Sequence, residues 1–215
     1  MKHLIIIGAG GLGRCIFDVA RKSVGYGTEF DIKGFIDDNT QALDGLTNYP
    51  PILSTIADYI IDNDDVFVCA MGEVHVKRKI TEQMNSKGAS FQTIVHQSAV
   101  IGTNTKIGKG SVIFEYVVIS PDTIVGENTL VQNFAVIGHD CKIGNNVRID
   151  THCTCVGGTI VHDGATLHTG SVINHNVEVG ENAVVAACSF VIKSVEPYTT
   201  VMGNPARKLF VNKPQ

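Results

Sequence analysis

The pattern of apolar and polar positions changes once along this chain of 215 residues. Up to residue 95, short apolar runs alternate with segments whose apolar residues recur at helical spacing. This alternation predicts a small β-α-β domain with a parallel sheet. We expect strands at 4–7, 32–36, 66–70 and 91–95, and helices at 12–22, 54–61 and 75–87.

From Ala99 onward, the apolar positions repeat every six residues. Sixteen consecutive hexads run without interruption to Ser194. The third residue of each hexad is aliphatic in fifteen cases and Cys155 in the other, and the first is always Ala, Thr, Ser, Val or Cys. A fixed six-residue period over so long a stretch predicts a β-helix.

The hexad pattern also predicts how such a β-helix is built. Six residues form one short strand and a turn, and three hexads close an 18-residue triangular coil. The bulky third residue should point inward, and the small first residue should sit inside near a corner. Glycine and asparagine suit turns that need unusual backbone angles. Coils stack about 4.8 Å apart, so a little over five coils make a prism about 25 Å tall.

Composition excludes several classes of protein. The net charge of -4 gives no basic face for nucleic acid, and no apolar run reaches the roughly 18 residues of a membrane span. Met1-Lys2-His3 leads straight into the first expected strand, which is unlike a signal peptide, so we expect a cytoplasmic protein. The six scattered cysteines are interpreted as small buried residues, a reading preferred over metal ligation by Cys153 and Cys155.

A glycine-rich turn follows the first expected strand. The stretch from Gly8 to Gly13 matches the G-x-G-x-x-G pattern, and a strand, turn and helix N-terminus together form an anion site. Three interpretations stay open: NAD with an aspartate on its ribose, a nucleotide sugar, or glycines that only let the helix pack on the strand. The short first domain, with no substrate domain after it, disfavours NAD. The ligand-facing residues would be Gly10, Gly11, Gly13, Asp37 and Asp38.

The hexads resemble those of the left-handed β-helix acyltransferases, and the segment VMGNPAR at 201–207 is similar to their C-terminal G-x-P-A signature. With a short β-α-β domain in front, the chain resembles bacterial sugar O- and N-acyltransferases of the NeuD, PglD, PerB and VioB type. The resemblance implies an α/β Rossmann-like nucleotide-sugar-binding domain at 1–95 and an all-β left-handed β-helix acyltransferase domain at 96–215. It also implies acetyl-CoA as acyl donor and a homotrimer, with no metal.

Acyl transfer to an amine or hydroxyl needs a base for the acceptor proton and a donor for the developing oxyanion. His139, followed by the carboxylate of Asp140, is the best candidate for the base among eight histidines. Gly157 lies 18 residues later, directly above or below His139, where it leaves room for a thioester. The alternative is that His139 is a polar corner residue and that Asp140 merely suits a turn.

The resemblance assigns the same roles: His139 as general base, Asp140 as its orienting partner and the Gly157 N–H as oxyanion donor. Arg148 stands where some relatives carry a second histidine, and an arginine there can meet a phosphate or carboxylate of the acceptor. Lys193, Arg207 and Lys208 are either partners of the CoA phosphates or solvated basic residues. The full set expected to bind acetyl-CoA is Gly157, Ala187, Lys193, Arg207 and Lys208.

The leading hypothesis is an acetyl-CoA-dependent N-acetyltransferase acting on the 4-amino group of a nucleotide-linked sugar in surface-glycan synthesis. The nearest alternative is O-acetylation of sialic acid or a related sugar. Two other classes remain: a zinc lyase of the carbonic-anhydrase type, and a non-catalytic nucleotide-sugar-binding protein. The spacing of His162, His168 and His175 scatters them over different faces or heights, which disfavours a zinc cluster. His175 can line the same cleft as His139, whereas His152, His162 and His168 are expected at the surface or an interface.

Overall fold

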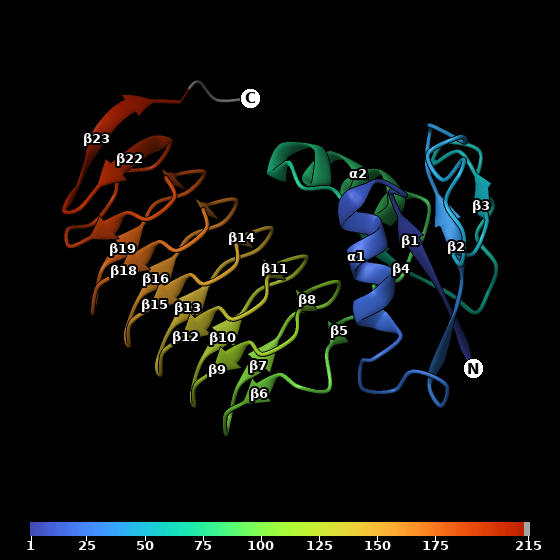
Figure 1. Cartoon of the computed structure of the whole chain (residues 1–215), viewed down its shortest axis with the longest axis horizontal. Helices are drawn as coiled ribbons and strands as arrows, with labels where there is room; N and C mark the ends of the chain where they lie inside the picture. The colour runs from blue at the N-terminus through green and yellow to red at the C-terminus, as the bar shows by residue number, and fades with distance from the viewer. Residues whose placement is uncertain (213–215) are drawn as a thin grey trace. The chain divides into compact units, whose positions relative to one another are not determined.

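The structure is a computed structural model that describes residues 1–212, and it divides into two compact units, Met1–Gln97 and Ser98–Gln215. The first unit contains a parallel sheet of order β3-β2-β1-β4 (Figure 1). The strands are β1 (Lys2–Ile7), β2 (Phe30–Ile36), β3 (Ile52–Ser54) and β4 (Asp65–Cys69), and β5 (Ile94–Val95) follows. The helices are α1 (Gly11–Ala20) and α2 (Val74–Ser86).

Continuous apolar runs form this sheet because both of its faces are covered, as is usual for parallel strands. The four residues from Leu4 to Ile7 are fully buried. Ile5, Ile7 and Phe67 pack in one cluster with Met84 of α2. The β-α-β prediction is therefore confirmed for this unit.

Two details of the first unit differ from the sequence prediction. Ile52–Ser54 forms an additional strand, β3, and no helix forms at 54–61. The backbone of Ile56 is bound by groups outside the segment: its N–H donates to Asp38 Oδ1 (3.0 Å), and its carbonyl accepts from Lys87 Nζ (3.2 Å). The last expected strand is reduced to β5, with only an isolated bridge between Phe91 and Phe67 before it.

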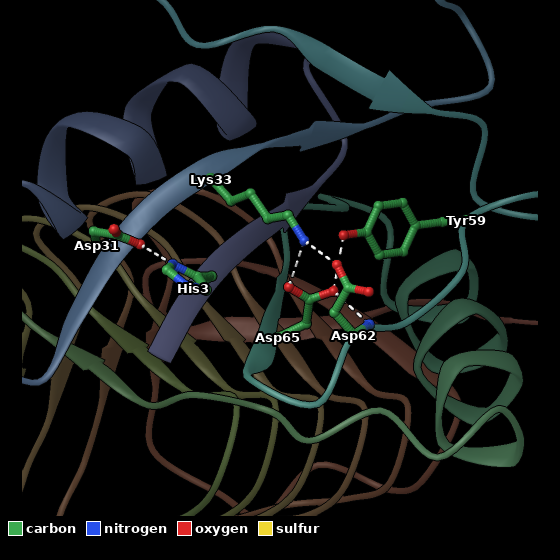
Figure 2. A network of polar contacts seen from close by, with 6 residues as sticks. All are labelled: His3, Asp31, Lys33, Tyr59, Asp62 and Asp65. Atoms are coloured by element: carbon green, nitrogen blue, oxygen red, sulfur yellow. Dashed lines mark hydrogen bonds and ion pairs between the residues drawn. The ribbon is translucent and has the colours of Figure 1, made fainter. Parts of the chain in front are cut away.

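A polar network ties β2 to the start of β4 (Figure 2). Lys33 Nζ donates to Asp62 Oδ2 (2.7 Å) and to Asp65 Oδ1 (2.8 Å), and the Tyr59 hydroxyl donates to Asp65 Oδ2 (2.8 Å). Burial alone would raise the pKa of Asp65, whose side chain is inaccessible to solvent. The bonds from Lys33, the Asp62 amide and Tyr59 outweigh burial and hold this pKa below its usual value. The carboxyl ends of the strands, where ligands bind in such sheets, remain free of this network.

The second unit is the predicted left-handed parallel β-helix. Each of the sixteen hexads contributes a two-residue strand at its second and third positions, and strands 18 residues apart pair in parallel. Figure 1 shows these coils stacked one upon another, in colours from green to red. The strands are β6 (Val100–Ile101), β7 (Lys106–Ile107), β8 (Val112–Ile113), β9 (Val118–Ile119), β10 (Ile124–Val125), β11 (Leu130–Val131), β12 (Val136–Ile137), β13 (Lys142–Ile143), β14 (Arg148–Ile149), β15 (Thr154–Cys155), β16 (Ile160–Val161), β17 (Thr166–Leu167), β18 (Val172–Ile173), β19 (Glu178–Val179), β20 (Val184–Val185) and β21 (Phe190–Val191).

The strands form three faces of the prism. The first face is β6-β9-β12-β15-β18-β21, the second is β7-β10-β13-β16-β19, and the third is β8-β11-β14-β17-β20 with β22 (Thr199–Gly203) added. β23 (Ala206–Val211) pairs with β22 antiparallel. The first corner joins the first and second faces, the second corner joins the second and third, and the third corner joins the third and first.

Burial follows the hexad positions as predicted. The residue at the third position of each hexad is buried from Val125 on, and the residue at the first position is buried from Ser111 on. The first residues also carry hydrogen bonds between coils: Thr123 Oγ1 donates to the Gly138 carbonyl and Thr129 Oγ1 to the Gly144 carbonyl, each at 2.8 Å. A small hydroxyl at this position therefore satisfies a corner carbonyl inside the prism. The sixth position adopts a left-handed backbone from Asn104 through Cys188, which explains its many Asn and Gly residues.

Candidate active site

His139 and Asp140 lie together on the first corner, between β12 and β13. The His139 Nδ1 atom is 2.7 Å from Asp140 Oδ2, and both side chains are about two-thirds exposed. Asp140 is the sixth residue of its hexad and has the left-handed φ of 58° typical of that position. When Nδ1 donates to the carboxylate, Nε2 carries the lone pair and can accept a proton from a substrate.

Gly157 occupies the same corner one coil later, as its spacing predicted. A Cβ built on Gly157 would lie 2.6 Å from His139 Nε2 and 2.7 Å from Cε1, so the imidazole rests directly on the glycine backbone. The backbones also approach closely, because a Cβ on Gly138 would lie 2.6 Å from the Gly157 nitrogen. Glycine at these two positions lets the imidazole and the two backbones approach one another this closely.

The amide of Gly157 lies at a fifth position of its hexad, where the bonding of the amide differs from coil to coil. On the second corner, the fifth-position amides of Glu127 and Asn145 donate at 2.8 Å to side-chain oxygens of the following coil, whereas those of Asp163 and Glu181 donate to no acceptor among the described residues. Within residues 1–212, the Gly157 amide donates to no protein acceptor, whereas its neighbour Gly158 donates to the His139 carbonyl (2.9 Å). A donor without a protein acceptor, beside Nε2, has the chemistry required of an oxyanion site.

His175 continues the same corner one coil beyond Gly157, and its side chain is exposed. Its neighbour Asn176 closes over Gly158, where a Cβ would meet Asn176 Oδ1 at 2.1 Å. The first corner thus presents His139, then Gly157, which is buried beneath the His139 ring, and then His175 in successive coils.

Sequence reasoning missed a second histidine–carboxylate pair, on the third face. Asp150 is buried, with Oδ2 2.9 Å from His168 Nδ1 and Oδ1 2.7 Å from Arg148 Nε. Burial would raise the pKa of Asp150, but the bonds from His168 and Arg148 hold it below its usual value. The signal was present in the sequence, because Asp150 and His168 are 18 residues apart at the same hexad position. Arg148, expected to meet a substrate anion, directs its Nε and one terminal nitrogen at Asp150, and its contact with a substrate stays a prediction.

The glycines of the glycine-rich turn are of two kinds, those required for packing and those open to a ligand. A Cβ on Gly13 would lie 1.9 Å from the Gly8 carbonyl oxygen, so Gly13 is required for packing of α1 on β1. A Cβ on Gly10 or Gly11 would meet nothing within 4 Å. Gly10 caps α1 without a side-chain bond, and the first amides of a helix have no intrahelical acceptor. These two glycines are therefore open to a ligand, and Gly13 faces the protein.

The two aspartates after β2 are partly engaged within the unit. Asp37 Oδ2 accepts from the Ala9 amide in the glycine-rich turn (2.7 Å), and its Oδ1 accepts from the Asn39 amide (2.8 Å). Asp38 Oδ1 accepts from Ile56. Asp37 thus fixes the turn itself, while exposed Asp38 keeps one oxygen outside the contacts made by the described residues.

Comparison with known proteins places these features in one family. The model described as PglD N-terminal domain matches residues 3–84, and that of bacterial transferase hexapeptide repeats matches 122–157 and 158–193. A UDP-N-acetylbacillosamine N-acetyltransferase of Bacillus subtilis is 29% identical over 116 residues, 53% of this chain. That match spans 51% of the relative, about half its length. The chain belongs to the sugar acyltransferase family with a PglD N-terminal domain and hexapeptide repeats.

Solved structures of two similar proteins cover nearly the whole chain. The acetyltransferase domain of PglB from Neisseria gonorrhoeae in complex with acetyl coenzyme A has a TM-score of 0.87 and 27% identity over 97% of this chain and 99% of that one. PerB from Caulobacter crescentus in complex with CoA and GDP-perosamine has a TM-score of 0.86 over 98% of both chains. At 21% identity, the PerB likeness concerns the fold alone.

The remaining residues expected to bind CoA lie late in the β-helix. Ala187 is exposed at a fifth position of the third corner, and Lys193 follows β21. Lys208 Nζ donates to Glu196 Oε2 (3.0 Å), and Arg207 donates to the Ala206 carbonyl (3.0 Å), both at the surface. Lys193, Arg207 and Lys208 stay predictions as partners of the CoA phosphates.

The remaining predictions concern membrane spans and metal clusters. No helix among residues 1–212 is long and apolar enough to cross a membrane. In the same residues, no three His, Cys, Asp or Glu side chains gather where they could hold a metal ion. His162, considered as a zinc ligand, lies 3.5 Å from Glu178 Oε2, a single carboxylate.

Proposed function

We propose that this chain transfers the acetyl group of acetyl-CoA to the 4-amino group of a nucleotide-linked amino sugar in surface-glycan biosynthesis. The observation that carries the proposal is the His139–Asp140 pair resting on Gly157. The relatives support the substrate classes: one is named a UDP-N-acetylbacillosamine N-acetyltransferase, and another is solved with acetyl coenzyme A.

The chemistry follows from the atoms on the first corner. The sugar amine attacks the thioester carbonyl carbon, and His139 Nε2 takes the proton that the amine loses. The Gly157 N–H donates to the oxyanion formed on the carbonyl oxygen. The C–S bond then breaks, the amide forms, and the imidazolium returns the proton to the departing thiolate. Asp140 keeps the imidazole in the orientation and tautomer that leave Nε2 free to accept the proton.

The proposal extends to the acceptor, the assembly and the compartment. The acceptor phosphates bind at the turn of Gly10 and Gly11, with Asp38 near the ribose or base. The chain works as a homotrimer in the cytoplasm, with one prism supplying the second wall of its neighbour's cleft. The outward apolar residues of the first face support the assembly, since Val100 is 59% and Val136 38% exposed.

Mass spectrometry of purified protein with acetyl-CoA tests the proposal directly. The acceptors are UDP-, GDP- and dTDP-linked 4-amino sugars, with free sialic acid as a separate arm. We expect one acetyl group on the amine of one nucleotide sugar. If sialic acid is the only acceptor that is acetylated, the activity is O-acetylation, and the proposed N-acetylation is wrong. Failure to bind CoA by calorimetry, together with no product, would indicate a non-catalytic binding protein.

A further inference from the structure

Three aromatic rings form a stack along the third corner of the β-helix. Tyr116 and Phe134 have centroids 5.2 Å apart and planes 11° apart, and Phe134 and His152 have centroids 5.0 Å apart and planes 6° apart. Each ring belongs to the sixth residue of its hexad, 18 residues from the next. All three residues are exposed, so the stack is not part of the interior of the prism.

The backbone makes this an unusual place for rings. The φ angles of Tyr116, Phe134 and His152 are 59°, 60° and 61°, in the left-handed region that bulky side chains seldom adopt. On the first and second corners, the described left-handed sixth positions are filled by Asn, Asp and Gly. Consecutive rings at strained positions, on the surface, indicate a use beyond packing of the coils.

The stack stops at an open position. The next sixth residue on this corner is Gly170, with a φ of 70°. A Cβ there would meet within 4 Å only the Cys188 Sγ atom, at 3.5 Å. Phe134 covers one face of the His152 ring, so the other face points toward Gly170, which has no side chain to cover it. Cys188 is two coils beyond His152, roughly 9–10 Å away. A fourth ring at the repeat of the stack would lie between these two residues, beside Gly170.

We propose that the open position at Gly170 binds a nucleobase, which stacks on His152 as the fourth ring of the series. Bases stack on aromatic side chains in this way without needing a fixed set of hydrogen bonds. The geometry alone indicates that the ligand group is a flat ring. The choice of a nucleobase rests on the proposed function, because both acetyl-CoA and a nucleotide sugar carry one.

NMR of the full chain tests the site. The ring protons of His152 are followed while adenosine 3′,5′-bisphosphate, the adenine-bearing part of CoA, or UDP is added in separate titrations. We expect one of the two to move these signals upfield, as a stacked base would, and the responding arm identifies the source of the base. Absence of a shift at saturating concentrations of both would overturn the proposal.

Matched variants give a second readout. Gly170→Phe places a ring of the protein in the open position and should weaken binding of the responding nucleotide about tenfold or more. Gly164→Phe alters a sixth-position glycine with the same φ of 70° on the second corner and should leave binding unchanged. If Gly170→Phe fails to fold, His152→Asn removes the stacking partner with a residue that tolerates the backbone. Equal loss in Gly170→Phe and Gly164→Phe, or no loss in His152→Asn, would contradict the site.

Acetyl transfer measured on the same samples separates this inference from the proposed function. Turnover without any His152 shift would overturn the nucleobase site and leave the acetyltransferase standing. A His152 shift without turnover on any acceptor would overturn the acetyltransferase and leave the nucleobase site standing.

Discussion

The imidazole of His139 rests on the backbone of Gly157 in the next coil, so closely that a Cβ on the glycine would lie 2.6 Å from Nε2. Two residues 18 apart in sequence thereby form one site. The contact places an imidazole and a backbone amide on the same side of the first corner.

Replacing this glycine should separate activity from stability. In Gly157→Ala, the added Cβ displaces the exposed His139 ring, and kcat should fall about 10- to 100-fold because the base is misplaced. The ring can swing into solvent, so the free energy of unfolding should change by less than about 1 kcal/mol. Steady-state kinetics and thermal unfolding measure the two effects. Glu181→Ala, at the same hexad position on the second corner, is the control and should leave kcat unchanged.

The carboxylate of Asp140 should matter to catalysis and not to the turn. Asp140→Asn keeps a residue that tolerates the left-handed backbone but loses the charge that orients His139. We expect kcat to fall about 10- to 100-fold with little change in melting temperature. Asp122→Asn makes the same change at the same corner one coil earlier, where φ is 60°. An equal loss of activity in Asp122→Asn would contradict a specific role for Asp140.

The glycine-rich turn should divide into structural and ligand-facing positions. Gly13→Ala places a Cβ against the Gly8 carbonyl and should cost about 1–3 kcal/mol of unfolding free energy. Gly10→Ala and Gly11→Ala meet no atom within 4 Å, so they should fold normally and weaken nucleotide-sugar binding. Thermal unfolding and calorimetry distinguish the two. Unchanged binding in both Gly10→Ala and Gly11→Ala would leave the turn a purely structural role.

Acidification should lower the free energy of unfolding of the first unit, because it protonates Asp65. Its folded pKa lies below the unfolded value, so its contribution is present above the unfolded pKa. That contribution is lost as the pH falls through the folded pKa. Asp65→Asn should lower stability at pH 7 by about 1–3 kcal/mol, because Lys33 and Tyr59 lose a charged acceptor. Urea unfolding at pH 7 and pH 3 should show a smaller loss on acidification in the variant than in the parent. An equal loss in both would contradict the assignment.

The fold of the second unit could be predicted from the sequence because each hexad repeats the same local requirement. An aliphatic residue or cysteine at the third position and a small residue at the first recur in all sixteen hexads, and a left-handed turn residue recurs in fifteen. One register therefore determined where His139 and Gly157 would meet. The first unit offered no such repetition. Its segment at 54–61 has helical spacing, yet contacts from Asp38 and Lys87 hold the backbone of Ile56 in a turn.

The hexad register predicted which residues of the site share a corner, but not the contacts of their side chains. It brought His139, Gly157 and His175 to one corner, but it did not reveal that Arg148 would turn to Asp150. The Arg148–Asp150 contact depends on the burial of the Asp150 carboxylate. That burial results from packing on the third face and cannot be derived from the hexad pattern. The ring stack was likewise predictable, because Tyr116, Phe134 and His152 follow one another at intervals of 18 residues.

The central claim is that His139 is the base for acetyl transfer to a sugar amine. The most direct measurement is kcat for transfer from acetyl-CoA to the responding nucleotide-linked amino sugar, compared between the parent and His139→Asn. We predict a loss of about 100-fold or more, with melting temperature and CoA binding retained. A folded His139→Asn variant that keeps the parent kcat would contradict the account.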